Sequence, residues 1–448
     1  MRAGDGPDAR GGDADGGDDD ALGTDYASLA TELAERDAVG FVAVGDRFDD
    51  DLRWLTRFSG PDRNYAFVAT DAPGSDSHGD DAGDSGDDPD ESPDGDAAGD
   101  DTATDDLHTA LCAPALFDEQ ARREFPGEAV LTDRQGDHAG VRAAAALSAR
   151  GVDGGTVLVP QSIPHDAAVY LSDAGYEVAS TDAIARARRT KTDAEIDRLR
   201  RVQRAAIRGV ARAEAILAEA TPDPDADDGA GAVRWNGGAL STERLRRQVN
   251  EVLAAHGVRD AGNTVIGAGA TAADLHYTGT DAIRPGETVL LDVSPRGPDG
   301  YYGDVTRTFA VDPDGGWERR AYLAVERARE AALAEVAAGV PASTVHEEAA
   351  AELAAHGFRV DSDAVGFTHS TGHGVGVSLH EGPSLSADEP LAAGDVVTIE
   401  PGVYDPGEGG VRLEDLIVVA DDGYDLLGEY PFSLVPRRRE GSQPHRQP

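Results

Sequence analysis

The chain has 448 residues and a formal net charge of −45, because 85 Asp and Glu residues stand against only 40 Lys and Arg residues. Its length exceeds that of one ordinary core and predicts two domains. The acidic charge argues against nucleic acids and anionic membranes as partners, since phosphate groups bind to basic surfaces. A single cysteine excludes an internal disulfide framework, and no apolar run suits a signal peptide or a membrane-spanning helix. We therefore expect a cytoplasmic protein.

The choice of charged residues indicates the environment in which the protein works. Lys191 is the only lysine, so nearly all the positive charge is arginine, and aromatic residues make up only 5% of the chain. An acidic surface with so little lysine suits strong salt, in which dissolved ions screen the repulsion between carboxylates. This composition predicts a halophilic cytoplasm.

The N-terminal part begins with a Gly/Asp-rich stretch, residues 1–22, which we expect to be a disordered acidic tail. Helical spacing follows at 26–36, and apolar runs at 40–44 and 65–70 predict strands. Residues 71–106 contain no Lys, Arg, aromatic or branched aliphatic residue. We interpret them as a disordered acidic insertion between two strands, the second resuming near Leu107. A solvated halophilic loop is favoured there over metal buffering or partner docking.

The remainder of the N-terminal part alternates helices and strands. The pattern predicts a helix at 139–150, a strand at 156–160, a helix at 165–175 and a strand at 176–180. Strands that alternate with helices are typical of α/β domains. We therefore predict an α/β domain over residues 23–187.

The second half begins near residues 188–193, where Thr192 or Asp193 is positioned to cap a helix that continues to about Glu219. Residues 222–238 are Gly/Asp/Pro-rich and predict a loop, and Ser241 begins a second capped helix that ends at His256. Further amphipathic helices are predicted at 317–340 and 343–356, where His346 and His356 are expected to cap a helix or face water. Curved antiparallel strands with flanking helices give an α+β domain over 188–436, with a tail at 437–448.

Five residues of this second half have side chains that suit metal binding: Asp292, Asp304, His373, Glu400 and Glu414. Each acid alone would fit a turn or a strand end, but bare carboxylates in apolar surroundings are costly to bury. Crowded carboxylates stay ionised only with positive charge among them, and two divalent metals would balance four acids. Oxygen ligands with one imidazole suit Mn, Co, Fe or Zn.

The order of the surrounding motifs resembles a known family. After Asp292 come Gly303-Asp304-Val305-Thr306-Arg307-Thr308, Gly372-His373-Gly374, Glu400-Pro401-Gly402 and Arg412-Leu413-Glu414-Asp415. In this order the set resembles the pita-bread (M24) metallopeptidases, and within them the Xaa-Pro peptidase branch of aminopeptidase P and prolidase. The resemblance spans residues 191–416 and implies a creatinase-like N-terminal α/β domain followed by an α+β pita-bread catalytic domain.

The resemblance also implies a role for each site residue. Asp304 and Glu414 would bridge two metal ions, with Asp292, His373 and Glu400 as further ligands. Glu400 would also take a proton from the attacking water. The other positions that match the family motifs are a substrate-side histidine, two histidines flanking the site and an arginine that orients ligands: His276, His369, His380 and Arg412.

The activity implied is hydrolysis of the peptide bond between an N-terminal residue and proline by a homodimeric Xaa-Pro aminopeptidase. Mn²⁺ is the favoured metal, with Co²⁺, Zn²⁺ or Fe²⁺ as alternatives, and the substrate is a proline-containing peptide. Three other interpretations stay open: an Xaa-Pro dipeptidase (prolidase), a metal-free creatinase-like hydrolase, and a non-catalytic pita-bread binding protein. Metal content and the choice between dipeptide and tripeptide distinguish them.

Two positions depart from the family pattern. Ser294 stands where a glycine is usual two residues after the first aspartate, and Leu275 replaces a common proline before His276. Neither change removes a ligand, so we expect both to affect the local loop shape and the substrate preference.

Overall fold

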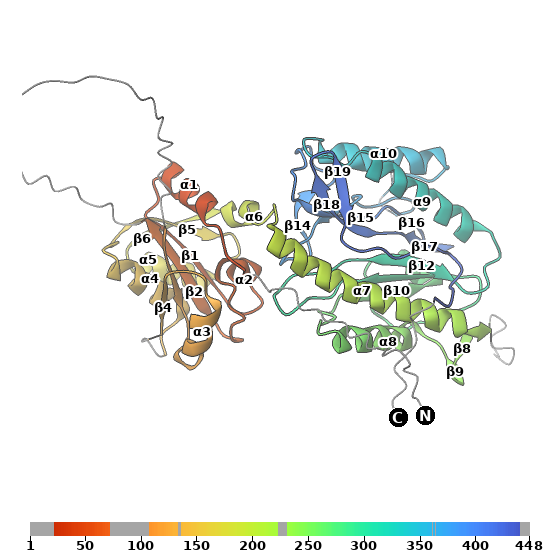
Figure 1. The fold of residues 1–448 in the computed structure, drawn as a ribbon, viewed down its shortest axis with the longest axis horizontal. Coiled ribbons are helices and arrows are strands. Elements are labelled where there is room, and N and C mark those ends of the chain that lie inside the picture. The colour runs from red at the N-terminus through yellow and green to blue at the C-terminus, as the bar shows by residue number, and fades with distance from the viewer. Residues whose placement is uncertain are drawn as a thin grey trace, which may run out of the picture.

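The computed structural model describes residues 22–71, 107–132, 136–222, 231–360, 362 and 364–439. The predicted acidic tail and acidic insertion lie outside the described residues, apart from Leu22 and Asp71 at their edges, and so does most of the C-terminal tail. Figure 1 shows two parts of the chain, which meet between helices α6 (Ala183–Ala187) and α7 (Asp193–Glu219). Within the described residues, no helix combines the length and apolar character needed to cross a membrane.

The N-terminal part is built on a six-stranded mixed sheet with the order β4-β3-β2-β1-β5-β6. β1 pairs antiparallel with β2 and parallel with β5, whereas β5–β6 and β3–β4 are parallel pairs. The strands are β1 (Gly40–Gly45), β2 (Tyr65–Asp71), β3 (Leu107–Cys112), β4 (Ala129–Leu131), β5 (Gly155–Pro160) and β6 (Tyr176–Thr181). This mixed sheet confirms the predicted α/β class.

Helices accompany this sheet along the chain. The predicted ones are α1 (Ala27–Glu35), α4 (Ala139–Ala149) and α5 (His165–Asp173); those without a sequence prediction are α2 (Asp50–Thr56), the 3-10 turn η1 (Ala115–Phe117), α3 (Asp118–Glu124) and α6. α2 begins with Asp49, whose side chain accepts a hydrogen bond from Leu52 N at 2.8 Å, a normal N-cap. Its inner residues Leu52 and Leu55 are fully buried, so α2 is a fixed part of the N-terminal core.

β2 and β3 are neighbours that pair antiparallel, with Asp71 opposite Leu107 and Ala66 opposite Cys112. The acidic segment between them therefore connects two adjacent strands, and β3 begins at Leu107 as the sequence predicted.

The C-terminal part contains antiparallel sheets covered by helices. One sheet has the order β10-β11-β12, a second β14-β13-β15-β18-β19, and two smaller ones contain β16-β17 and β7-β8-β9. The bounds are β7 (Thr221–Pro222), β8 (Val233–Trp235), β9 (Gly238–Ala239), β10 (Thr264–Ala268), β11 (Thr288–Val293), β12 (Thr306–Ala310), β13 (His373–Gly374), β14 (Glu381–Ser384), β15 (Val396–Ile399), β16 (Gly402–Asp405), β17 (Gly409–Arg412), β18 (Asp415–Ala420) and β19 (Gly423–Leu426). This arrangement confirms the predicted α+β class.

Among the described residues, the helices that flank these strands are α7, α8 (Thr242–Ala255), α9 (Trp317–Ala334) and α10 (Ala342–Ala355), and a 3-10 turn η2 (Gly269–Ala273) follows β10. Thr192 caps α7 in a capping box with Glu195, and Ser241 caps α8, as predicted. α9 ends at Ala334, six residues before the predicted Val340, and Glu335 is its C-cap. The predicted loop at 222–238 contains β8, whose Trp235 packs into the core, and the first residue of β9.

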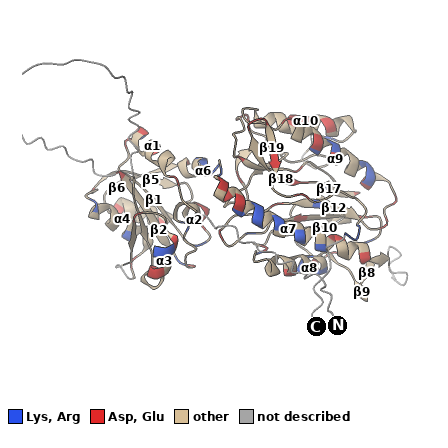
Figure 2. Ribbon diagram, viewed as in Figure 1, with Lys and Arg blue, Asp and Glu red and all other residues tan. Residues whose placement is uncertain are grey.

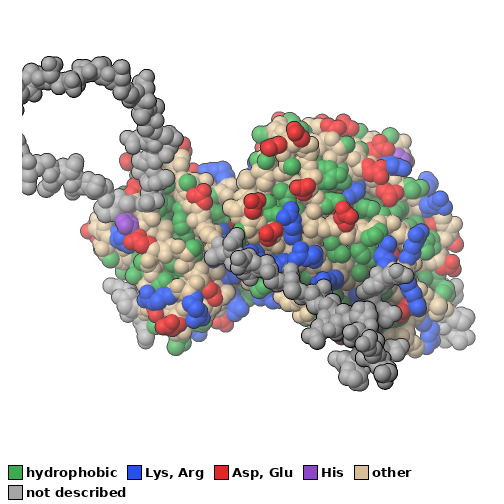
Figure 3. All heavy atoms as spheres, viewed as in Figure 1, with side chains coloured by type: hydrophobic (Ala, Val, Ile, Leu, Met, Phe, Trp, Pro, Cys, Tyr) green, Lys and Arg blue, Asp and Glu red, His purple; other side chains and the backbone are tan. Residues whose placement is uncertain are grey.

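The charged side chains lie mainly on the outer faces. Figure 2 shows acidic and basic positions mixed along α7, whose arginines are Arg198, Arg200, Arg201, Arg204, Arg208 and Arg212. In the space-filling view of the same face, basic side chains over this helix are surrounded by acidic and apolar ones (Figure 3). The apolar stripe of α7 includes Leu199, Val202 and Val210, which are buried against the sheets.

Candidate metal centre

Three of the predicted acidic ligands converge where β11, β12 and β17 meet. Asp292 lies one residue before the end of β11, opposite Thr306 of β12, and Asp304 stands two residues before β12 begins. Glu414 lies between β17 and β18, where its backbone N–H donates to the Thr306 carbonyl at 3.1 Å. Oxygen atoms of the three carboxylates all lie within 4.8 Å of one another.

The other two predicted ligands reach the same point from the five-stranded sheet. His373 is on β13, which pairs with β15, and Glu400 directly follows β15. The Thr398 hydroxyl accepts from His373 N at 3.1 Å and donates to Glu400 Oε1 at 3.1 Å. His373 Nε2 lies 3.3 Å from Glu400 Oε1 and 3.9 Å from Asp304 Oδ2. The five side chains therefore form one cluster.

The electrostatics of this cluster fit a site for divalent cations. Burial, reinforced by the neighbouring carboxylates, raises the pKa of Glu414 to about 8 and that of Asp304 well above its usual range. Burial also raises the pKa of Glu400 to about 7, although the positive charge of Arg412 opposes the shift. Positive ions among these oxygens would restore the ionised forms, and four carboxylates with one imidazole are donors that suit Mn, Co, Fe or Zn.

These pKa shifts predict how the metal-free protein responds to pH. Glu414 ionises near pH 4.5 when unfolded and near pH 8 when folded, so between these values the folded state binds more protons. The free energy of unfolding of the metal-free protein should therefore fall as pH rises from about 4.5 to about 8. Denaturant unfolding of the wild type and of Glu414→Gln checks this: the variant should become the more stable protein by a few kcal/mol near pH 8. Equal pH dependence in the two proteins would contradict it.

A cavity of about 260 Å³ contains this cluster. All nine predicted site residues line it: His276, Asp292, Asp304, His369, His373, His380, Glu400, Arg412 and Glu414. The rings of His373 and His380 lie 4.3 Å apart. The structure thus brings together every side chain that the sequence singled out.

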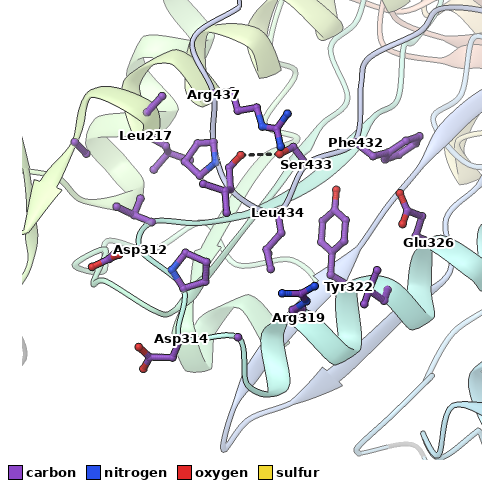
Figure 4. Close-up of a pocket in the computed structure, with 18 of the residues that line it drawn as sticks. Leu217, Asp312, Asp314, Arg319, Tyr322, Glu326, Phe432, Ser433, Leu434 and Arg437 are labelled. Carbon is purple, nitrogen blue, oxygen red and sulfur yellow. Dashed lines mark hydrogen bonds between the residues drawn. The ribbon is translucent and has the colours of Figure 1, made fainter.

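A larger hollow of about 920 Å³ lies elsewhere, between the start of α9 and residues 432–437. Figure 4 shows its acids, Asp312, Asp314 and Glu326, well separated around the wall, with Arg319 and Arg437 among them. Within the part of the chain that the structure describes, only Asp292, Asp304 and Glu414 gather three potential metal ligands so closely. The smaller cavity is therefore the candidate site.

Tyr404 is a member of the site that the sequence analysis missed. On β16, its hydroxyl accepts from Arg412 Nη1 at 3.1 Å and lies 2.8 Å from His369 Nε2, while His369 Nδ1 is 2.7 Å from the Ser370 carbonyl. Burial, followed by the charge of Arg412, lowers the pKa of His369 to about 3, so the ring is neutral. Nδ1 then carries the proton and donates to Ser370, and Nε2 accepts from Tyr404.

Arg412 connects Tyr404 to the metal cluster through further hydrogen bonds. Its Nη2 donates to Asp292 Oδ2 at 2.5 Å, and its Nε donates to Thr306 Oγ1 at 3.1 Å. The Thr306 hydroxyl in turn donates to Glu414 Oε2 at 2.7 Å. His369 and Tyr404 therefore hold the arginine that orients two of the acids, as second partners of metal ligands commonly do.

We expect Tyr404→Phe to lower kcat/KM of the metal-loaded protein by about 10- to 100-fold, the usual effect of losing such a partner. The phenyl ring keeps the packing but removes the link between His369 and Arg412. Steady-state kinetics with saturating metal checks this, with Tyr424→Phe on exposed β19 as the control. Unchanged kinetics in Tyr404→Phe would show that Arg412 is held without the hydroxyl.

Ser294, one of the two departures from the family pattern, contacts two of the acids. Its hydroxyl lies 2.9 Å from Asp292 Oδ1 and 2.8 Å from Asp304 Oδ1. Because the hydroxyl carries one proton, it donates to one carboxylate at a time and restrains both. A glycine at this position would have no such contact.

We expect Ser294→Ala to weaken divalent metal binding by about 10-fold, since the two acids lose a shared hydrogen-bond partner. Calorimetric titration of chelator-stripped protein with Mn²⁺ measures this directly, without reference to turnover. Ser148→Ala, which removes a hydroxyl that donates to the exposed Asp153 in the N-terminal part, serves as the control. Equal affinity in wild type and Ser294→Ala would remove Ser294 from the site.

His346 corrects one prediction. It was expected to cap a helix or face water, but its Nδ1 accepts from Thr371 N at 3.2 Å and its ring packs on Phe367 at 5.3 Å. Thr371 in turn accepts through its carbonyl from Glu400 N at 2.8 Å. His346 therefore supports the segment between His369 and His373 through its hydrogen bond with Thr371. His256 and His356 are the C-terminal caps of α8 and α10, as predicted.

Known proteins resemble this chain in sequence. The metallopeptidase family M24 matches residues 197–421, just over half of the chain. A probable dipeptidase PepE of Mycobacterium bovis is 31% identical over 261 residues, which are 58% of this chain and 63% of that protein. An Xaa-Pro dipeptidase of Pyrococcus furiosus is 34% identical over 180 residues, 40% of this chain and 50% of that protein. The chain thus matches less than two thirds of the length of these relatives.

Solved structures share the fold over nearly the whole chain. An Xaa-Pro dipeptidase from Bacillus anthracis gives a TM-score of 0.71 at 20% identity and covers 91% of this chain and 98% of its own. An X-Pro aminopeptidase from Thermotoga maritima gives 0.67 at 18% identity and covers 90% and 99%. These matches confirm the predicted pita-bread domain behind an N-terminal α/β domain. With the family match over residues 197–421, they lead to one conclusion: the chain belongs to metallopeptidase family M24.

Proposed function

We propose that the protein is a dinuclear-metal-dependent Xaa-Pro dipeptidase, which hydrolyses the bond between a residue and a following proline. Membership of family M24 implies a dinuclear metal site. The observation that carries the proposal is the convergence of Asp292, Asp304, His373, Glu400 and Glu414 on one cavity within this family's fold. The halophilic and cytoplasmic setting and the homodimer stay predictions.

Two observations favour a dipeptidase over the Xaa-Pro aminopeptidase that the sequence analysis placed first. Relatives at 31% and 34% identity have names that describe dipeptidases. The cavity of about 260 Å³ is also slightly smaller than the ~300–1,000 Å³ typical of small-molecule sites. Such a volume suits a dipeptide better than a longer peptide.

The five ligands would hold two divalent metal ions, which would lower the pKa of a water molecule and polarise the peptide carbonyl. Glu400 stands beside His373 and Arg412, where it would accept the proton from that water and return it to the proline nitrogen as the bond breaks.

His276 and His380 also line the cavity, and the His380 ring lies 4.3 Å from that of His373. Both would donate to the substrate carbonyl oxygen or to its terminal carboxylate, and fixed donors stabilise developing charge without reorganisation. His369 has both ring nitrogens engaged and would act only by holding Tyr404 and Arg412.

The test is hydrolysis by chelator-stripped protein restored with Mn²⁺ in concentrated KCl, using Ala-Pro and Ala-Pro-Ala as substrates. Cleavage of Ala-Pro alone is the expected result. Cleavage of Ala-Pro-Ala before the proline would instead assign an Xaa-Pro aminopeptidase. Metal-independent hydrolysis of other amides would indicate the creatinase-like alternative, and no metal binding at all would leave the binding protein.

A further inference from the structure

Lys191, the only lysine of the chain, is buried where the two parts meet. Its Nζ lies 2.6 Å from Glu381 Oε1 and donates to the Arg189 carbonyl at 2.7 Å. The two charged side chains are only 2% and 3% exposed. A buried charge needs such a partner, so each of these two groups depends on the other.

Glu381 is the residue that follows His380, at the start of β14. Its carboxylate packs directly against Gly376, where an added Cβ would collide with it. Residues 376–381 therefore form a loop that packs against this carboxylate. The ion pair between Glu381 and Lys191 holds the loop in place. Arg188 adds a second cation, with Nε at 3.7 Å from Glu381 Oε2.

The same loop is also tied to the N-terminal part. Arg188 donates to Ser378 Oγ at 2.9 Å and pairs with Asp51 of α2 at 3.1 Å. Ser378 donates to Asp50 Oδ2 at 2.6 Å, and Asp50 pairs with Arg296 at 2.8 Å. The loop is thus held between α2 and the segment 188–191 by charges that lie outside the cavity.

We propose that the Lys191–Glu381 ion pair positions His380 in the cavity. His380 is one residue from Glu381, and its ring stands 4.3 Å from that of His373. Neither Lys191 nor Glu381 lines the cavity, so both act through the loop. The proposal deepens the proposed function, on which its kinetic test rests, by adding two positioning residues and a route from the N-terminal part to the substrate side.

The space around residue 191 explains why this position holds a lysine, although every other Lys or Arg position of the chain is an arginine. The compact ammonium group reaches a carboxylate and a carbonyl within a narrow buried space, whereas a planar guanidinium is larger and directs its donors differently. We therefore expect Lys191→Arg to behave like a loss of the pair and not as a conservative change.

The test uses the double variant Lys191→Met/Glu381→Gln in the metal-loaded full chain, because removal of both charges leaves no unpaired buried ion. We expect metal affinity to be unchanged and kcat/KM for Ala-Pro to fall by about 10- to 100-fold, as for a misplaced site group. Adding His380→Ala to this variant should cost nothing beyond His380→Ala alone, since residues that act as one are not additive.

The matched control is Arg439→Met/Glu214→Gln, another ion pair with a buried carboxylate, 2.6 Å apart, whose residues do not line the cavity. Its effect should add to that of His380→Ala. Wild-type kinetics in Lys191→Met/Glu381→Gln, or additivity of that variant with His380→Ala, would overturn the proposal.

A second measurement separates this proposal from the proposed function. The ring signal of His380 in histidine-labelled protein, assigned by its loss in His380→Ala, should shift in Lys191→Met/Glu381→Gln and stay in place in the control pair variant. This holds whether or not the wild type cleaves Ala-Pro. An unshifted signal would overturn the positioning role, and absent Ala-Pro cleavage with a shifted signal would overturn only the proposed function.

Discussion

Asp304→Asn is expected to abolish metal-dependent hydrolysis while leaving the metal-free protein folded. Asp304 is buried at the centre of the cluster, near Asp292, Glu414 and His373. An amide of the same size removes one negative charge and the bridging ligand that we propose, so we expect the cluster to hold fewer metal ions. We expect activity to fall by more than the ~100-fold that loss of a ligand's hydrogen-bond partner costs.

Two measurements check this prediction. Mn²⁺ titration should show fewer ions bound by Asp304→Asn, and thermal unfolding of the stripped variant should show no loss of stability, because the crowding that raises the carboxyl pKa values is relieved. Asp312→Asn, in the larger hollow, should behave as wild type. Full activity in Asp304→Asn would refute the dinuclear proposal.

Arg307→Met is expected to cause the largest loss of stability. Arg307 is 1% exposed and donates to the carbonyls of Thr306, Glu414 and Tyr430 and to Asp415 Oδ1, and its guanidinium lies over Phe432 at 4.3 Å. Its loss removes a donor from the Glu414 and Tyr430 carbonyls and leaves Asp415 with its partner Arg329. Breaking such a buried pair costs about 3–5 kcal/mol.

Denaturant unfolding of the metal-free protein measures this effect without interference from metal binding. Arg247→Met, an exposed arginine in a helical pair with Glu243, is the matched control and should change stability little. Because Arg307 holds the Glu414 carbonyl, metal affinity in Arg307→Met should also fall. A variant as stable as wild type would mean that water replaces the guanidinium.

The sequence predicted the metal cluster well because each ligand belongs to a short motif with fixed neighbours. These motifs could therefore be recognised one by one along the chain. The structure places all five ligands in the lining of one cavity: Asp292, Asp304, His373, Glu400 and Glu414. The spacing of apolar residues likewise located most of the helices and strands. The bounds shifted where neither glycine nor proline marks a helix end: α9 ends at Ala334, five residues before Gly339.

The missed residues act across elements that are distant in sequence. Tyr404 resembled any apolar residue of a short strand, and only the approach of His369 and Arg412 gives its hydroxyl a role. His346 occupied an ordinary helical position until Thr371 was seen to lie against it. The Lys191–Glu381 contact joins residues 190 positions apart, and no local pattern predicts such a pair.

The pairing of β2 with β3 has a consequence for how this protein can diverge. Asp71 and Leu107 are partners across the sheet, so the chain leaves and re-enters at adjacent points. The entropy needed to close a loop between fixed ends grows only with the logarithm of its length. Evolution can therefore lengthen, shorten or exchange the sequence between these two strands at little thermodynamic expense, and engineers can graft a binding peptide or a fluorescent domain there.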